Sequence, residues 1–84
     1  MNRTTRTALK RWLREQHWTQ ERLAAYLGVR QGNLSLMMSG ARNVSLDAGL
    51  KIADLTGIPA EDLITEPKTL ELLKSYANRQ NSHA

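Results

Sequence analysis

The residues with the clearest chemical potential lie in segment 31–39, and that potential is hydrogen bonding rather than catalysis. At about 100° per residue, a helix here has one apolar face, made by Leu34, Met37 and Met38. The opposite face is small, polar and almost uncharged, with one stray leucine, and it consists of Gly32, Ser35, Leu36 and Ser39. Such a surface is unusual for a helix that faces only water.

Charge is distributed unevenly along the chain. Residues 1–44 carry eight Lys/Arg against two Asp/Glu, whereas residues 45–84 carry four against six. A basic half joined to a mildly acidic half indicates one face adapted to a polyanion. For any single residue, solvation of a helix surface is the simpler interpretation.

Composition excludes several classes of protein. The chain has no cysteine, so it forms neither disulfides nor thiolate metal sites, and His17 and His83 lie too far apart in sequence to suggest a metal site. It contains no nucleophile–base pair, phosphate loop or carboxylate pair, so we expect neither an enzyme nor a cofactor or small-molecule ligand. No signal peptide or apolar run of about 20 residues is present, so we expect no membrane partner and a cytoplasmic, nucleoid-associated protein.

The elements that must position segment 31–39 are all expected to be helices, because no alternation of period two is sustained. Thr19 and Ser45 are good N-caps, and Gly28, Gly40 and Gly57 are expected to end the helices before them. The expected helices are Thr5–Gln16 with a cap at Thr4 or Thr5, Gln20–Leu27, Gln31–Ser39, Leu46–Thr56, Pro59–Ile64 and a last one from Pro67. In the fourth helix the candidate buried residues are Leu46, Leu50, Ile52, Ala53 and Leu55.

Residues 19–40 have the form of a helix-turn-helix, since two short helices flank a turn that contains Gly28. Ala24 is small where the helices must approach, and Val29 and Leu34 fill the wedge between them. On this pattern the chain resembles the Cro and lambda-repressor-like (XRE-type) helix-turn-helix family from about Leu9 to Ile64. The matching residues are Thr19, Gln20, Leu23, Ala24, Leu27, Gly28, Val29, Leu34, Ser35, Gly40, Leu46, Leu50, Ile52, Ala53, Gly57, Ile58, Leu63 and Ile64.

The resemblance implies an all-α fold. It implies a compact five-helix lambda-repressor-like DNA-binding domain over residues 1–64, followed here by an extra C-terminal helix and tail over residues 65–84. The third helix would insert its N-terminal residues into the major groove while the second crosses the backbone. Base contacts are expected from Gln31, Gly32, Asn33, Ser35 and Leu36.

Within that scheme, Gln31 can bond an adenine edge and Leu36 can touch a thymine methyl. Gln20 is expected to meet a phosphate, and Arg30 and Arg42 to neutralise others. The full set of expected DNA-binding residues is Thr19, Gln20, Arg30, Gln31, Gly32, Asn33, Ser35, Leu36, Ser39, Arg42 and Asn43. The simpler alternatives are that Gln31 is merely solvated and that Leu36 belongs to the core.

The N-terminal arginines have two interpretations, namely an arm on DNA made by Arg3 and Arg6, or an ordinary disordered basic terminus.

Four positions depart from the family pattern or call for explanation. Many members have an Arg–Glu ion pair where this chain has Leu13 and Met38, which we expect to touch, so Leu13→Arg alone should destabilise and Met38→Glu should rescue it. Gly32, inside the third helix, indicates a close approach of DNA, a helix that orders on binding, or a helix that begins one residue later. Gly49 indicates close helix packing or an interface.

The resemblance predicts a sequence-specific transcriptional regulator, a repressor of the short phage Cro or restriction-modification controller type. A homodimer on double-stranded DNA with two-fold-related half-sites would supply the contacts that one small domain lacks. The expected dimer interface is Ile64 with the stripe Leu70, Leu73 and Tyr76, unless that stripe folds back on its own core. The alternative is an antitoxin-type module that binds a protein partner through its C-terminal helix.

Overall fold

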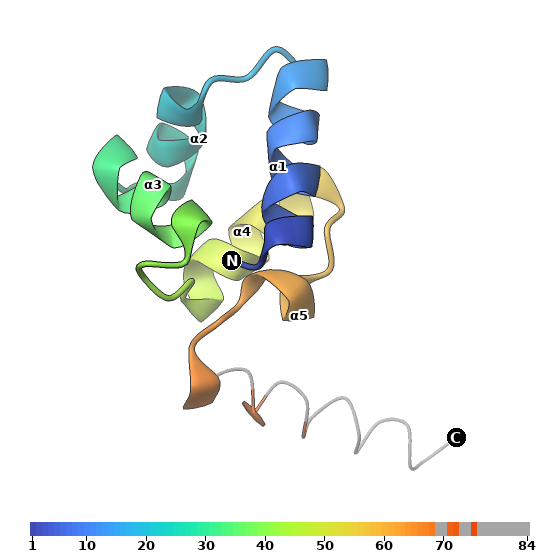
Figure 1. Cartoon of the computed structure of the whole chain (residues 1–84), viewed down its shortest axis with the longest axis vertical. Coiled ribbons are helices and arrows are strands. Elements are labelled where there is room, and N and C mark those ends of the chain that lie inside the picture. Colours follow the sequence, from blue (N-terminus) through green and yellow to red (C-terminus); the bar gives the residue numbers. More distant parts are fainter. Residues whose placement is uncertain (69–70, 73–74, 76–84) are drawn as a thin grey trace.

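A computed structural model describes residues 1–68, 71–72 and 75, and its elements in that part of the chain are α-helices. Figure 1 shows them packed against one another, with α1 beside α4 and the pair α2–α3 on the other side. The helices are α1 (Arg3–Glu15), α2 (Gln20–Leu27), α3 (Gln31–Ser39), α4 (Leu46–Thr56) and α5 (Ala60–Leu63). The expected bounds of α2, α3 and α4 are confirmed, and α5 is one residue shorter at each end than expected.

Local chemistry sets most helix ends. The hydroxyl of Thr19 accepts a hydrogen bond from the Arg22 backbone N–H, and that of Ser45 accepts one from Ala48, so both expected N-caps are confirmed. Gly28, Gly40 and Gly57 all end helices with φ between 72° and 89°, a backbone conformation that glycine adopts most easily. The prediction for α1 was wrong, because its N-cap is Asn2 and the helix begins at Arg3.

Because α1 begins at Arg3, the N-terminus is part of the folded domain. Arg3 and Arg6 lie within α1, so they form neither a free arm nor a disordered tail. Thr5 is buried rather than capping, and its hydroxyl donates to the backbone oxygen of Asp62 at 3.3 Å. The terminal ammonium group of Met1 donates to the backbone oxygen of Met37 at 3.3 Å. The first helix is thereby fixed to the ends of both α3 and α5.

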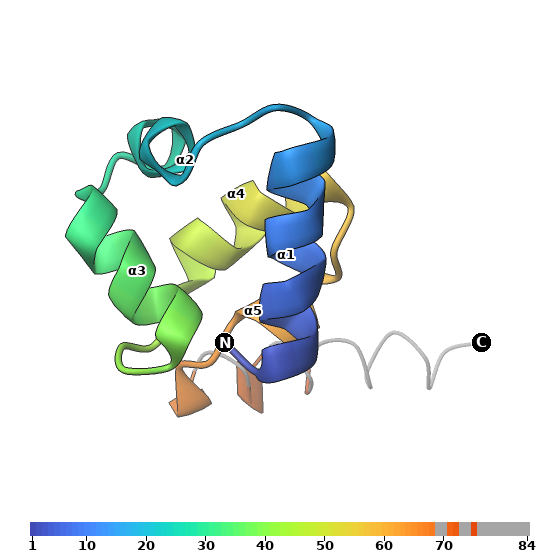
Figure 2. The same cartoon turned by 45° about the horizontal axis from the view of Figure 1, so that its top comes forward.

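The core lies where the inner faces of the helices meet, and α4 crosses behind α1 and α3 in Figure 2. The largest fully buried side chains of the core are Leu9, Leu23, Leu34, Val44, Ile52, Leu63 and Ile64. Leu13 and Met38, which stand where many family members have an Arg–Glu ion pair, are both buried in this core. Their direct contact stays a prediction. Ala24 is 3% exposed at the α2–α3 junction, which agrees with the need for a small residue there.

Two leucines of α4 were placed wrongly from the sequence. Leu46 and Leu50, expected in the core, are 41% and 47% exposed, while Ala48 and Gly49 take the buried side of the helix. A Cβ atom added to Gly49 would lie 2.3 Å from Cγ1 of Ile64. Gly49 therefore serves close packing within the chain, and it brings Ile64 into the core at 1% exposure.

This burial corrects the expected dimer interface, because the side chain of Ile64 is covered by its own subunit. The other three residues of that expectation, Leu70, Leu73 and Tyr76, lie outside the described residues. Residues 67–68, 71–72 and 75 are helical, as expected for the start of the last helix, and Leu72 is 69% exposed.

Aromatic contacts fix the corner between α1 and α2. Trp18 meets Trp12 edge-on at a centroid distance of 5.4 Å and Tyr26 at 6.1 Å. The Arg22 guanidinium lies over the Trp18 ring, 3.9 Å from its centroid. Because Trp18 directly precedes the N-cap of α2, these contacts position the start of that helix relative to α1.

Candidate nucleic-acid interface

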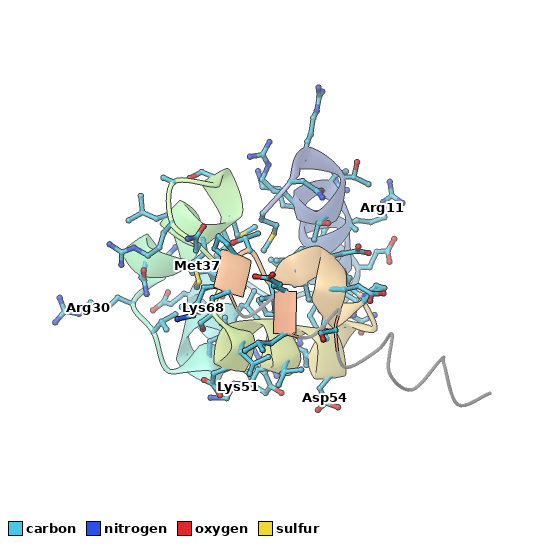
Figure 3. The ribbon with its side chains drawn as sticks, turned by 90° about the horizontal axis from the view of Figure 1, so that it is seen from below. Arg11, Arg30, Met37, Lys51, Asp54 and Lys68 are labelled. Carbon is cyan, nitrogen blue, oxygen red and sulfur yellow. The ribbon has the colours of Figure 1, made fainter. Side chains whose placement is uncertain are left out.

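The two faces of α3 have opposite environments. Leu34, Met37 and Met38 are buried, and the label on Met37 in Figure 3 shows its side chain among the helices. The residues of the other face, Gly32, Ser35, Leu36 and Ser39, are all exposed. Leu36 is 41% exposed, so the alternative that it belongs to the core is wrong. The polar face of α3 is open to a partner.

The eleven residues expected to bind DNA all have accessible side chains or backbone. Gln20 and Asn33 are half-buried, and the other nine are exposed. They come from three consecutive pieces of structure: the start of α2, the whole of α3 and the loop that follows it. Arg30, at the N-cap of α3, extends away from the body of the protein in Figure 3.

The beginning of α3 differs from the beginnings of the other long helices. Asn2, Thr19 and Ser45 each accept a backbone hydrogen bond at the start of α1, α2 and α4, whereas Arg30 makes no side-chain cap. The first backbone N–H groups of α3 therefore lack an acceptor from the cap residue, and they carry the positive end of the helix dipole. This end of α3 suits an anion.

The loop after α3 folds back onto it. The Arg42 backbone N–H donates to the Leu36 oxygen at 3.1 Å, and the Ser39 hydroxyl donates to that same oxygen at 3.1 Å. The Arg42 guanidinium donates to Oδ1 of Asn33, so a cation of the loop lies beside a half-buried amide of the helix. This bond leaves the two amide N–H donors of Asn33 available, together with the remaining donors of Arg42.

The structure excludes one of the three explanations offered above for Gly32 in α3. The helix begins at Gln31, so the suggestion that it begins one residue later is wrong. A Cβ atom at Gly32 would meet nothing within 4 Å, so no packing among the described residues requires this glycine.

Two cations of α1 lie beside this surface: Lys10, which the sequence did not single out, and Arg6, which was considered only as part of a free N-terminal arm. Arg6 and Lys10 lie one helical turn apart in α1 and line a groove together with residues of α2 and α3. Their spacing of four residues, next to the buried Leu9 and Leu13, was the available signal. What the sequence does not display is the proximity of α1 to α3, which are separated by a whole helix along the chain.

Other chemistry has little support in the part of the chain that the structure describes. There, no group of three His, Asp or Glu side chains gathers where it could hold a metal ion. None of the helices in those residues has the length and apolar character needed to cross a membrane.

Comparison with known proteins identifies the same region. A family model described as helix-turn-helix matches residues 9–63, which is about two thirds of the chain and ends with α5. Neither the curated proteins nor the solved structures gave a match to this chain.

Proposed function

Because the chain belongs to the Cro- and CI-like, XRE-type helix-turn-helix family of DNA-binding transcription regulators, we propose that α3 reads the base sequence of its operator. The observation that carries this proposal is the open polar face of α3, formed by Gly32, Ser35, Leu36 and Ser39. A helix with that face outward fits the major groove of B-DNA, where each base pair presents a distinct set of hydrogen-bonding groups.

Base readout falls to three accessible side chains of α3. Gln31 is exposed and offers both a donor and an acceptor, which suits the N6/N7 edge of adenine. Leu36 supplies an apolar contact for a thymine methyl. Asn33 acts differently, because its Oδ1 already accepts from Arg42 and its free N–H donors favour an acceptor edge such as guanine O6/N7 or thymine O4.

Backbone phosphates are met by residues on either side of this helix. Thr19 and Gln20 stand at the start of α2, and Arg30, Arg42 and Asn43 flank α3. Such contacts fix the register of the protein on DNA without reading the sequence. The uncapped N–H groups at the start of α3 support a further phosphate contact there.

In this proposal the protein is a homodimeric repressor of the short Cro type or the restriction-modification controller type. It is located on the nucleoid. One domain of this size makes few contacts, and a two-fold dimer doubles them on half-sites about one turn apart. The dimerisation segment is assigned to residues 65–84. The antitoxin alternative gains no support from the family match, which ends at residue 63.

Selection of bound duplexes from random DNA, combined with a salt titration, tests the function. We expect an enriched motif with two-fold-related halves, and affinity that falls steeply as salt rises because phosphate contacts release counterions. Recovery of random sequences with no common motif would contradict sequence-specific recognition. A single enriched half-site would contradict the dimer but leave the role of α3 standing.

A further inference from the structure

An open groove of about 280 Å³ separates α1 from α3 on the side where α2 begins. Its lining consists of Arg6 and Lys10 from α1, Gln20 from α2, and Ser35, Met38 and Ser39 from α3. Two positive side chains, two hydroxyls and an amide therefore surround one buried methionine, and the lining contains no carboxylate. The chemistry of this groove is that of an anion site.

The two cations are available to such a ligand. Arg6 is half-buried, and its guanidinium donates a long hydrogen bond of 3.5 Å to the Met38 backbone oxygen at the end of α3. This contact uses one of five guanidinium N–H donors and holds the group at the groove. Lys10 is exposed one turn further along α1. Neither cation forms an ion pair with a carboxylate in the described part of the chain.

The groove continues the candidate DNA surface. Ser35 and Ser39 belong both to the outer face of α3 and to the groove lining, and Gln20 belongs both to the groove and to the expected phosphate contacts. A helix lying in the major groove has phosphates running along both of its sides. The loop residues Arg30 and Arg42 approach α3 from its ends, whereas Arg6 and Lys10 approach it from α1.

From these observations we infer that the groove between α1 and α3 seats a DNA backbone phosphate, with Lys10 and Arg6 as its cations. The inference rests on the proposed function and assigns DNA-positioning roles to residues of α1 outside the helix-turn-helix itself. The bound group is a phosphodiester, since Ser35 and Ser39 join the groove to the surface that meets the bases. The contact positions α3 and carries no sequence information.

Lys10→Gln tests the proposed phosphate contact in the groove, and Arg11→Gln is its matched control. Both variants remove one positive charge from an exposed position of α1, but Arg11 lines a separate hollow with Arg3, Thr4, Thr7 and Ala8, and Figure 3 shows it projecting outward. We expect Lys10→Gln to reduce the slope of log affinity against log salt by about 0.9, as for one lost phosphate contact. Its relative affinities for matched and mismatched operators should not change.

Arg11→Gln should leave the slope almost as in the parent, and Lys10→Arg should restore it. Equal slopes for Lys10→Gln and Arg11→Gln would overturn the inference, as would a changed base preference in Lys10→Gln. A groove that binds inorganic phosphate, seen as amide NMR shifts near Lys10, while the DNA slope stays unchanged would also overturn it. If the parent protein binds no DNA, the proposed function fails first, so the two failures are distinguishable.

Discussion

The two helices that carry an internal glycine, α3 and α4, use it in opposite ways. Gly49 of α4 lies against Ile64, and an added Cβ atom would stand 2.3 Å from that side chain. Gly32 of α3 has nothing within 4 Å of the same position. The glycine of α4 is explained by packing inside the chain, whereas packing among the described residues does not explain the glycine of α3.

The outward faces of these helices differ in the same sense. That of α3 is polar and nearly uncharged, apart from Leu36. That of α4 carries the exposed Leu46 and Leu50 beside an ion pair of 3.3 Å between Lys51 and Asp47. Figure 3 shows Lys51 and Asp54 projecting from α4, while Arg30 projects from the start of α3. Exposure alone therefore does not mark a DNA surface, because both faces are open but only that of α3 lacks carboxylates.

A negative charge placed on each face should separate them most strongly. Ser35→Glu puts a carboxylate where the bases and phosphates are expected, and we expect affinity for the selected operator to fall by about 100-fold, or ~3 kcal/mol. Leu50→Glu makes the same charge change on α4 and should alter affinity by less than about threefold. Fluorescence anisotropy with labelled duplex measures both affinities, and equal losses in the two variants would contradict the assignment of the DNA surface to α3.

Alanine at each internal glycine gives the next largest effect. Gly49→Ala forces its methyl group against Ile64 and should lower the free energy of unfolding by about 1–3 kcal/mol. Gly32→Ala meets open space and should raise stability by up to about 1 kcal/mol, because alanine favours the helix. If DNA approaches the α3 backbone closely, the same variant binds its operator more weakly.

Thermal unfolding by circular dichroism and operator titration, applied to both variants, provide these values. Stabilisation by Gly49→Ala would show that Ile64 moves away easily. A Gly32→Ala protein that is more stable and binds DNA as tightly as the parent would remove the argument for close approach at that position.

The smallest effect is expected outside both helices, at the end of α1. His17 has φ of 57°, the one positive value at a non-glycine residue in the described part of the chain. The Trp18 N–H donates to the Leu13 oxygen at 2.8 Å and the His17 N–H to that of Arg14 at 3.2 Å, which is the bonding of a Schellman motif. His17→Gly should therefore stabilise by about 0.5 kcal/mol, since glycine adopts this conformation without strain.

Its melting temperature should rise by about 2–4 °C, and its operator affinity should equal that of the parent. This variant is the control for Gly32→Ala, because it changes stability without touching the interface. An affinity change in His17→Gly would mean that stability and binding are coupled, and it would weaken any conclusion drawn from α3 alone.

Local signals predicted much of the fold. Thr19 and Ser45 were recognised as caps because their hydroxyls bond backbone a few residues away, and Gly28, Gly40 and Gly57 as stops because each takes positive φ locally. The orientation of α3 was also predictable, since apolar residues gather on one face of the helix and small, mostly polar residues on the other.

The predictions that were wrong or missing concern contacts between residues far apart in the sequence. In α4 both possible faces contain leucine, so period alone did not reveal that Ala48 and Gly49 pack inward and Leu46 and Leu50 outward. The burial of Ile64 follows from its contact with Gly49 across the fold. The groove of Arg6 and Lys10 likewise exists only because α1 folds beside α3.

Amide NMR shifts on addition of the selected operator duplex show residue by residue whether the outer face of α3 meets DNA. We expect the largest shifts at residues 19–20, 30–36 and 42–43, with α4 almost unchanged. Shifts concentrated at Leu46, Leu50 or the segment after residue 64, with the outer face of α3 unaffected by saturating DNA, would contradict this expectation.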